Sequence, residues 1–305
     1  MESNPYQTLN EQYGIADHVQ IKAGPGGLAA VMVDNRHASA LITLAGGHVL
    51  RYQPKGQEPL LWVSPNAVFE AGKAIRGGVP VCWPWFGQHA TDSSKPMHGF
   101  VRTMVWTVAD TRAQEDGSTE VRLFVTDTPQ TLALWPHPFR LEIIVTVGPA
   151  LRVELAARNT GSEPFTYTTG LHPYFQVSDV VQINITGLEG VSYLDKEDGF
   201  RRKPGEDTLR IAGPVDRIYT GTERDMVIHD EGYGRAIRIR KTGSRTSVVW
   251  NPGENAARMP DLGAGNERTF VCAETVNAVD DTVTVAPGAE GRMGMEVTVE
   301  MQGAL

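Results

Sequence analysis

His172 stands in sequence surroundings that suit proton transfer. It lies in the motif TGLHPYF, after an expected strand through residues 165–168 and directly before Pro173. A residue that precedes proline is restricted to extended backbone, and the ordinary pKa of histidine, about 6.5, suits acid–base chemistry at neutral pH. A single histidine is more often structural or solvated, so the residue type alone leaves both interpretations open.

Glu274 is the second candidate for acid–base chemistry. It falls inside the apolar segment TFVCAET, which is expected to be a strand. A carboxylate in such a segment must be paired, must face a cleft or must have a raised pKa. Glu274 is therefore a candidate base. The alternative is that it lies on the solvent side of an alternating strand.

Two arginines flank a stretch rich in glycine, proline and aromatic residues. Arg76 lies in IRGGVPVCWPWFG, and Arg102 ends the motif MHGFVR. Guanidinium groups offer rigid donor forks to phosphate or to sugar hydroxyls, and tryptophan faces can stack on sugar rings. The alternative is that Trp83, Trp85 and Phe86 are core residues and that the arginines form surface ion pairs.

Other chemistry has less support in the sequence. Asp216 lies in PVDRIY, but an Asp-Arg neighbour pair is commonplace on surfaces. Cys82 and Cys272 lack metal-ligand spacing and a disulfide framework, which predicts reduced thiols and no metal site. No zinc-protease, esterase, dinucleotide or EF-hand motif is present.

The elements that must position these residues are mostly strands. Short alternating or β-branched segments between Gly, Pro, Asn and Asp predict strands at 103–109, 120–126, 140–147, 151–158, 236–241, 246–250, 269–275 and 295–301. One short helix is predicted at 129–135, with Asp127 or Thr128 as its cap. Two long irregular stretches, 69–101 and 251–267, are expected to be functional loops.

Length and composition restrict the class of protein. The 305 residues, 41% hydrophobic, carry no repeat and no linker, which predicts one all-β antiparallel domain, a sandwich or barrel, over 1–305. A net charge of −8 argues against a nucleic-acid partner. Neither a signal peptide nor a membrane segment is evident, so a cytoplasmic protein without a membrane partner is expected.

Seven motifs, taken in order, carry a resemblance to a known family. IRGGVPVCWPWFG, HGFVR, WPHPFRLE, TGLHPYF, PVDRIY, VVWNP and FVCAE run from about residue 70 to residue 278. This ordered set resembles the glucose-6-phosphate 1-epimerases, or hexose-6-phosphate mutarotases, of the galactose-mutarotase-like superfamily. The resemblance implies a large antiparallel β-sandwich with few short helices, a shallow sugar cleft, and no metal or coenzyme.

The resemblance also implies roles for individual residues. His172 and Glu274 correspond to the catalytic acid and base, Arg76 and Arg102 to phosphate and sugar ligands, and Asp216 to an acidic substrate ligand. Further substrate-cleft positions fall on His98 and on Met97, where relatives often carry glutamine. Gln88 or His89 is a possible substitute for the amide that Met97 lacks.

The activity expected from the resemblance is interconversion of the α and β anomers of a hexose 6-phosphate, by ring opening and reclosure. The expected partner is a small sugar phosphate, and a monomer is expected. A mutarotase for free aldoses and a non-catalytic carbohydrate-binding protein are the alternatives. The natural sugar, the pathway and any role of the two cysteines stay open.

Overall fold

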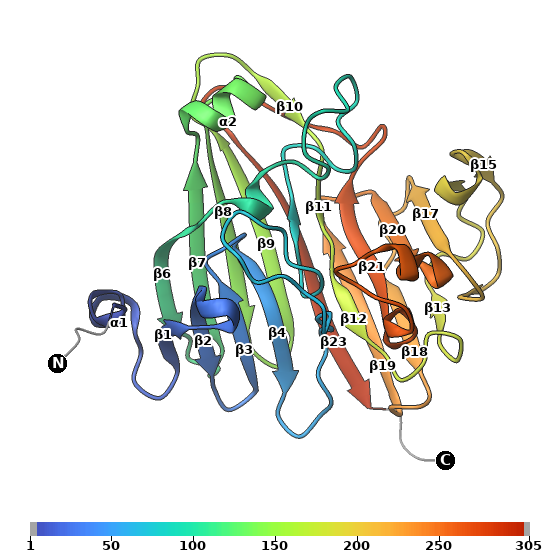
Figure 1. The fold of residues 1–305 in the computed structure, drawn as a ribbon, viewed down its shortest axis with the longest axis horizontal. Coiled ribbons are helices and arrows are strands. Elements are labelled where there is room, and N and C mark those ends of the chain that lie inside the picture. The colour runs from blue at the N-terminus through green and yellow to red at the C-terminus, as the bar shows by residue number, and fades with distance from the viewer. Residues whose placement is uncertain (1–4, 302–305) are drawn as a thin grey trace.

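The computed structural model describes residues 5–301, and its largest sheet has nine strands. Their order is β16-β13-β18-β19-β23-β9-β8-β7-β6 (Figure 1). The bounds are Leu209–Arg210 for β16, Asn184–Thr186 for β13, Met226–Asp230 for β18, Arg235–Thr242 for β19, Glu290–Met301 for β23, Leu151–Asn159 for β9, Phe139–Val147 for β8, Thr119–Thr126 for β7 and Thr107–Ala113 for β6. All pairings between named strands of the described residues are antiparallel.

An eight-stranded and a four-stranded sheet form the second layer. The first has the order β15-β14-β17-β20-β21-β11-β5, with β12 also paired to β21. Its bounds are Arg201–Lys203 for β15, Tyr193–Asp195 for β14, Val215–Thr220 for β17, Thr246–Asn251 for β20, Phe270–Asn277 for β21, Thr169–Leu171 for β11, Val81–Cys82 for β5 and Tyr174–Gln176 for β12. The second sheet comprises β1 Val19–Ala23, β2 Ala29–Asp34, β3 Ala38–Thr43 and β4 His48–Pro54. Isolated bridges such as Val49 to Val79 join the two.

The core lies between these layers. One continuous hydrophobic cluster includes Ile42 of β3 and Val249 of β20 from one layer, and Leu141 of β8 and Ile237 of β19 from the other. All four side chains are fully buried. Strands with one buried face alternate apolar and polar residues, which is the pattern that predicted them. The expected antiparallel β-sandwich is confirmed.

Most predicted strands occur within a few residues of their expected bounds, but the prediction for 103–109 is wrong at its start. Residues Val101–Thr103 form the 3-10 helix η2, and β6 begins only at Thr107. The indole of Trp106 donates to the carbonyl of Val101 (3.0 Å), which holds this turn. Val105 is left exposed beside it. A local side-chain hydrogen bond therefore overrides the strand preference of these residues.

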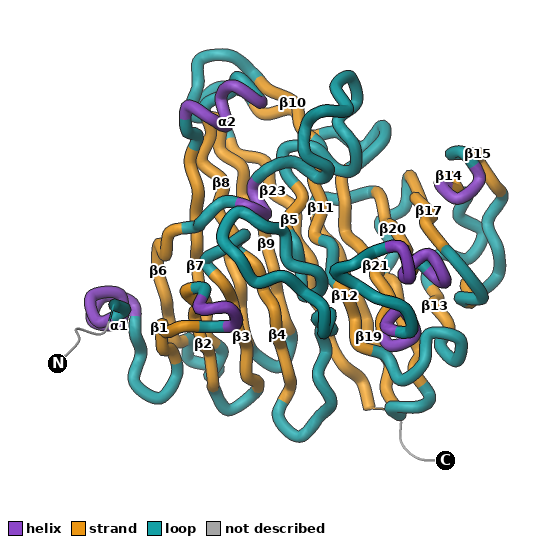
Figure 2. The backbone as a smooth tube through the Cα atoms, viewed as in Figure 1, coloured by secondary structure: helices purple, strands orange, loops and turns teal. Residues whose placement is uncertain are grey.

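The predicted short helix is confirmed as α2, Pro129–Leu134, and its cap is Thr128. The Thr128 hydroxyl accepts from the Thr131 amide (3.2 Å). The helix α1, Gln7–Tyr13, was not predicted, because it spans only seven residues and packs against the core through the partly buried Leu9 and Tyr13. Figure 2 shows how little helix accompanies the strands. The other short helices are η1 Pro25–Gly27, η3 Lys196–Asp198, η4 Gly253–Arg258 and η5 Asn266–Thr269.

A small two-stranded sheet completes the fold. It pairs β10 Phe165–Tyr167 with β22 Val283–Val285. The long stretches 69–101 and 251–267 are largely irregular, as predicted, although β5 and η4 lie within them. Within residues 5–301, no helix is long and apolar enough to cross a membrane.

Candidate active site

Strand pairing brings His172 and Glu274 together. Glu274 lies in β21, and His172 follows β11, which pairs with β21 so that Leu171 faces Thr275. The His172 amide also donates to the Pro80 carbonyl (3.1 Å), which fixes its backbone. His172 Nε2 lies 3.3 Å from Glu274 Oε1, and the two side chains are 12% and 1% exposed. The alternative of a solvent-facing Glu274 is therefore wrong.

Both side chains keep polar atoms without partners. His172 Nδ1 and Glu274 Oε2 are buried and have no hydrogen bond within the described part of the chain. Buried polar atoms are nearly always paired, and an exception calls for an explanation. Two exceptions on adjacent side chains indicate a site prepared for a ligand.

Burial makes the uncharged forms of this pair the favoured ones. It lowers the pKa of His172 well below its ordinary value, and the nearby His98 and Arg76 lower it further. It raises the pKa of Glu274 well above its ordinary value, with a second contribution from the charge of Asp216. Both shifts favour Glu274 over His172 as the holder of a proton that the pair shares. The contact becomes an ion pair only when that proton passes to His172.

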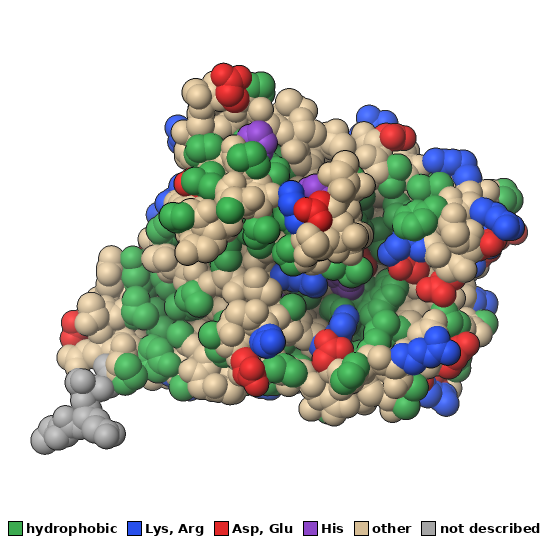
Figure 3. Space-filling model, turned by 45° about the horizontal axis from the view of Figure 1, so that its top comes forward, with side chains coloured by type: hydrophobic (Ala, Val, Ile, Leu, Met, Phe, Trp, Pro, Cys, Tyr) green, Lys and Arg blue, Asp and Glu red, His purple; other side chains and the backbone are tan. Residues whose placement is uncertain are grey.

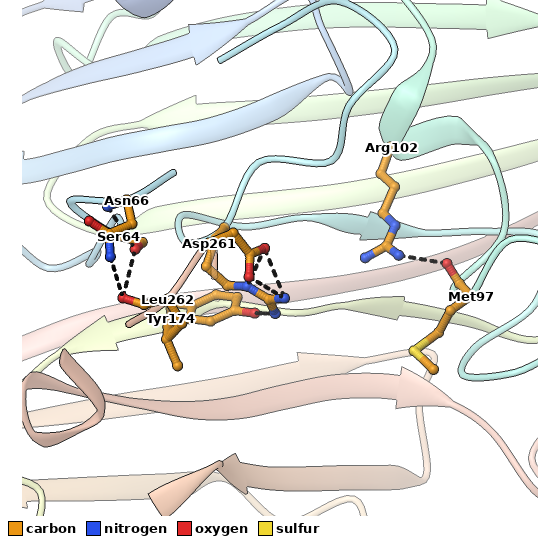
Figure 4. A network of polar contacts seen from close by, with 8 residues as sticks. Ser64, Asn66, Met97, Arg102, Tyr174, Asp261 and Leu262 are labelled. Carbon is orange, nitrogen blue, oxygen red and sulfur yellow. Dashed lines mark hydrogen bonds and ion pairs between the residues drawn. The ribbon is translucent and has the colours of Figure 1, made fainter. Parts of the chain in front are cut away.

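Arg76 is held by Asp261 and Tyr174, both labelled in Figure 4. Its Nε donates to Asp261 Oδ2 (3.0 Å) and its Nη2 to Asp261 Oδ1 (3.3 Å), while Nη1 donates to the hydroxyl of Tyr174 (3.1 Å). The loop after Arg76 needs glycine, because a Cβ on Gly78, with φ +62°, would lie 2.4 Å from the Val49 carbonyl oxygen. Arg76 is thus oriented and its charge compensated.

Arg102 makes fewer side-chain hydrogen bonds than Arg76. It lies in η2 and donates from Nη2 to the backbone carbonyl of Met97 (2.7 Å, Figure 4). No ion pair involves it among the residues that the structure describes. Four of its five N–H groups therefore remain for a ligand. The Met97 side chain is exposed.

Both proposed substitutes for an amide at Met97 already have contacts within their own loop. Gln88 donates from its side chain to the carbonyls of Ser93 (3.2 Å) and Lys95 (3.3 Å). The His89 ring packs edge-on against Trp85. A role for Gln88 or His89 in place of that amide stays a prediction.

His98 lies beside His172 and has a strained backbone conformation. Its φ is +64°, unusual for a residue with a Cβ, and it is held by its amide donating to Gly87 O (2.7 Å). Its Nδ1 accepts from the Gly87 amide (3.1 Å), which places the ring proton on Nε2. Burial, then the charge of Arg102, lowers the His98 pKa to about 3. The ring centroids of His98 and His172 are 5.7 Å apart.

Asp216 belongs to the cleft and not to a surface pair with its neighbour. Its Oδ2 lies 2.5 Å from Lys196 Nζ, whereas Arg217 pairs with Glu206 at 2.9 Å. Successive residues of β17 point to opposite faces, which separates the two pairs. The interpretation as an Asp-Arg surface pair is therefore wrong.

The aromatic residues near the site are not the ones the sequence indicated. Trp83 and Trp85 are buried in the core, which confirms the alternative that these two are core residues and excludes that they offer faces to a sugar. Trp250 of β20 is partly buried, and its ring lies 5.9 Å from those of His172 and Tyr174. Trp250 lies in the motif VVWNP, where strand alternation could have placed it on the Glu274 face.

One face of the molecule has a hollow that opens to solvent. Figure 3 shows histidine at its depth beside hydrophobic side chains, with charged side chains of both signs around it. A separate groove of about 860 Å³ lies between α1 and strands β1 to β3. It contains none of the predicted site residues. The unpartnered polar atoms favour the first hollow as the functional site.

A β-sandwich with a buried acid–base pair in an open cleft defines, by fold and site, the mutarotase type of sugar isomerase. The chain belongs to the aldose 1-epimerase family, whose profile matches residues 30–298. This confirms the resemblance seen in the ordered motifs and the expected class of enzyme.

Relatives and solved structures agree with that membership. An Escherichia coli K12 protein named "Putative glucose-6-phosphate 1-epimerase" is 35% identical over 82% of this chain and 84% of its own. A Cenchrus ciliaris protein of the same name is 33% identical over 88% and 84%. The crystal structure of a "putative mutarotase" from Salmonella typhimurium has a TM-score of 0.89 at 30% identity, covering 95% of this chain and 96% of that one.

Proposed function

We propose that the protein interconverts the α and β anomers of a hexose 6-phosphate, with D-glucose 6-phosphate as the first candidate. The observation that carries the proposal is the contact of 3.3 Å between His172 Nε2 and Glu274 Oε1, with a second polar atom of each side chain unpartnered. Anomer exchange requires one proton to leave the C1 hydroxyl and one to reach the ring oxygen. A buried pair that shares a proton supplies both transfers.

The proposed cycle starts from the uncharged pair. The proton of Glu274 passes to His172, and the Glu274 carboxylate then accepts the proton of the C1 hydroxyl. His172 donates its proton to the ring oxygen as the bond between C1 and that oxygen breaks, which leaves an aldehyde and an uncharged pair. Rotation about the C1–C2 bond and the reverse transfers close the other anomer. No covalent intermediate forms.

The two arginines support a phosphorylated substrate. Arg102 has no carboxylate partner in the described residues and keeps four donors free, so a phosphate would supply the missing counter-charge. Arg76 is oriented by Asp261 and Tyr174 and would add directed hydrogen bonds. The names of the relatives point to the same substrate class. His98, Asp216 and the backbone at Met97 would contact the sugar itself.

The decisive experiment is NMR exchange spectroscopy on equilibrated anomers with catalytic amounts of protein. Glucose 6-phosphate should show exchange far above the buffer rate, and free glucose at equal concentration should show much less. Equal rates on both sugars would replace the proposal by a free-aldose mutarotase. Binding of glucose 6-phosphate without any exchange would replace it by a carbohydrate-binding function.

A further inference from the structure

Lys196 was not singled out by any sequence pattern, yet its side chain enters the cleft. It lies in η3, between β14 and β15, where the Asp195 side chain accepts from the Glu197 amide (3.1 Å) and Gly199 ends the turn in a left-handed conformation. This turn directs the side chains of Asp195 and Lys196 to different partners. Asp195 pairs with Lys203, whereas Lys196 pairs with Asp216 of β17.

The Lys196–Asp216 pair is short and keeps hydrogen-bonding capacity. Nζ lies 2.5 Å from Oδ2, and the side chains are 33% and 14% exposed. Neither side chain has another hydrogen-bond or ion-pair partner in the described residues. An ammonium group has three donors and a carboxylate accepts several bonds. Two N–H groups of Lys196 and the second oxygen of Asp216 therefore remain available side by side.

Six ionisable side chains surround Glu274 from the elements packed against it. They are His172 after β11, Asp216 of β17, Lys196 of η3, Cys272 of β21, Cys82 of β5 and Tyr174 of β12.

Asp216 and Lys196 form the ion pair of this group. Burial raises the pKa of both thiols and of the Tyr174 hydroxyl, and it lowers the pKa of His172. The charge of Asp216 raises the pKa of Glu274 and that of Lys196 lowers it. The charge of Lys196 also reaches His98. This pair therefore lies next to the reacting centre.

We propose that Lys196 is a substrate-binding residue of this site. Together with Asp216 it holds two neighbouring ring hydroxyls of the sugar, the ammonium donating to one hydroxyl oxygen and the carboxylate accepting from the other. This assignment rests on the proposed function, because it requires a sugar in the cleft. It also gives Lys196 a second effect, since its charge favours the carboxylate form of Glu274 that accepts the C1 proton.

Lys203 offers a matched control on the same hairpin. It has nearly the same exposure as Lys196, 36% against 33%, and it pairs with Asp195 (2.7 Å) and Asp198 (3.2 Å). A loss caused only by a loosened hairpin would follow from Lys203→Met as well. A loss specific to the cleft would follow from Lys196→Met alone.

The test combines binding and turnover in Lys196→Met, Lys196→Arg and Lys203→Met. Calorimetry with glucose 6-phosphate should show about 10-fold or greater weakening in Lys196→Met, the effect of losing a charged hydrogen-bond donor. Lys196→Arg should recover part of that loss, and Lys203→Met should bind like the wild type. Thermal unfolding of each variant establishes that it is folded. If Lys196→Met fails to fold, the same comparison made with Lys196→Gln decides.

The pH dependence of anomer exchange separates a role in the cleft from a purely structural role of Lys196, because a structural role would leave it unchanged. Removal of the positive charge in Lys196→Met raises the pKa values of the catalytic pair, so its pH–rate profile should shift to higher pH. Removal of the negative charge in Asp216→Asn should shift it to lower pH. Unchanged binding and an unshifted profile in Lys196→Met overturn the assignment while the proposed function stands. Absence of exchange in the wild-type protein overturns the function instead.

Discussion

The proposed catalytic pair and the two arginines share a cleft but are held by different kinds of structure. Glu274 lies on β21 and His172 directly follows the adjacent strand β11; both are almost fully buried, with polar atoms left unpartnered. Arg76 and Arg102 lie outside the strands, and their donors already contact Asp261, Tyr174 and the Met97 carbonyl. Strand register therefore sets the acid–base geometry, whereas loop contacts set what the cleft binds. Chemistry and substrate choice can accordingly be perturbed separately.

The largest effect should come from Glu274→Gln. The amide cannot accept the C1 proton, so exchange should fall by roughly 10²- to 10⁴-fold, the usual contribution of a general base. Binding of glucose 6-phosphate and the melting temperature should change little, because Gln is nearly isosteric. Exchange spectroscopy and thermal unfolding measure both effects. Near-normal turnover would remove Glu274 from the mechanism, and His172→Ala tests its partner in the same way.

Arg102→Ala should act on substrate preference and not on the chemistry. Loss of a charged donor set should weaken binding of glucose 6-phosphate by about 10- to 100-fold, while slow exchange of free glucose persists. Isothermal calorimetry with both sugars checks this. Arg112→Ala is the control, because Arg112 is exposed and forms an ion pair with Asp110 at the surface. An unchanged preference for the phosphorylated sugar would separate Arg102 from phosphate binding.

Gly170→Ala should affect both stability and exchange, by less than the substitutions above. A Cβ on Gly170 would lie 2.7 Å from the Phe86 ring, and that ring contacts His98 at a centroid distance of 5.0 Å. Overpacking should cost about 1–3 kcal/mol in the free energy of unfolding, and exchange should fall moderately as His98 moves. Gly213→Ala, with no atom within 4 Å of its added Cβ, is the control. Equal stability of the two variants would contradict this contact.

The smallest effect concerns acid stability of the arginine region. His48 donates to the Gly77 carbonyl (2.7 Å) beside Arg76, and burial lowers its pKa to about 4. Between about pH 6.5 and pH 4, His48 takes up a proton in the unfolded chain but not in the folded one. The free energy of unfolding should therefore decrease as the pH is lowered through that range. His48 alone should contribute about 2 kcal/mol between pH 7 and pH 5. Urea unfolding of wild type and His48→Gln measures it, and equal pH slopes would contradict the assignment.

Much of the strand content could be predicted from the sequence, because alternation of apolar and polar residues reports which face is buried. Strands β7, β8 and β9 occur close to their expected positions for this reason. The start of β6 was missed because the indole of Trp106 bonds back to Val101, and α1 was missed because it is short and packs against the core only through the partly buried Leu9 and Tyr13. The alternation of apolar and polar residues records neither fact.

For the site, the identity of the candidate residues could likewise be predicted from the sequence, but their arrangement could not. The sequence alone identified His172, Glu274, Arg76, Arg102 and Asp216 as candidates, since motif order and residue chemistry are written along the chain. Their arrangement depends on pairing between distant strands. Only the tertiary structure decided that Glu274 faces His172 and that Lys196 joins Asp216. It also decided that Asp261 compensates the charge of Arg76, while Arg102 has no ion pair within residues 5–301. Charge balance in a cleft is a property of residues brought together by folding, which no linear pattern records.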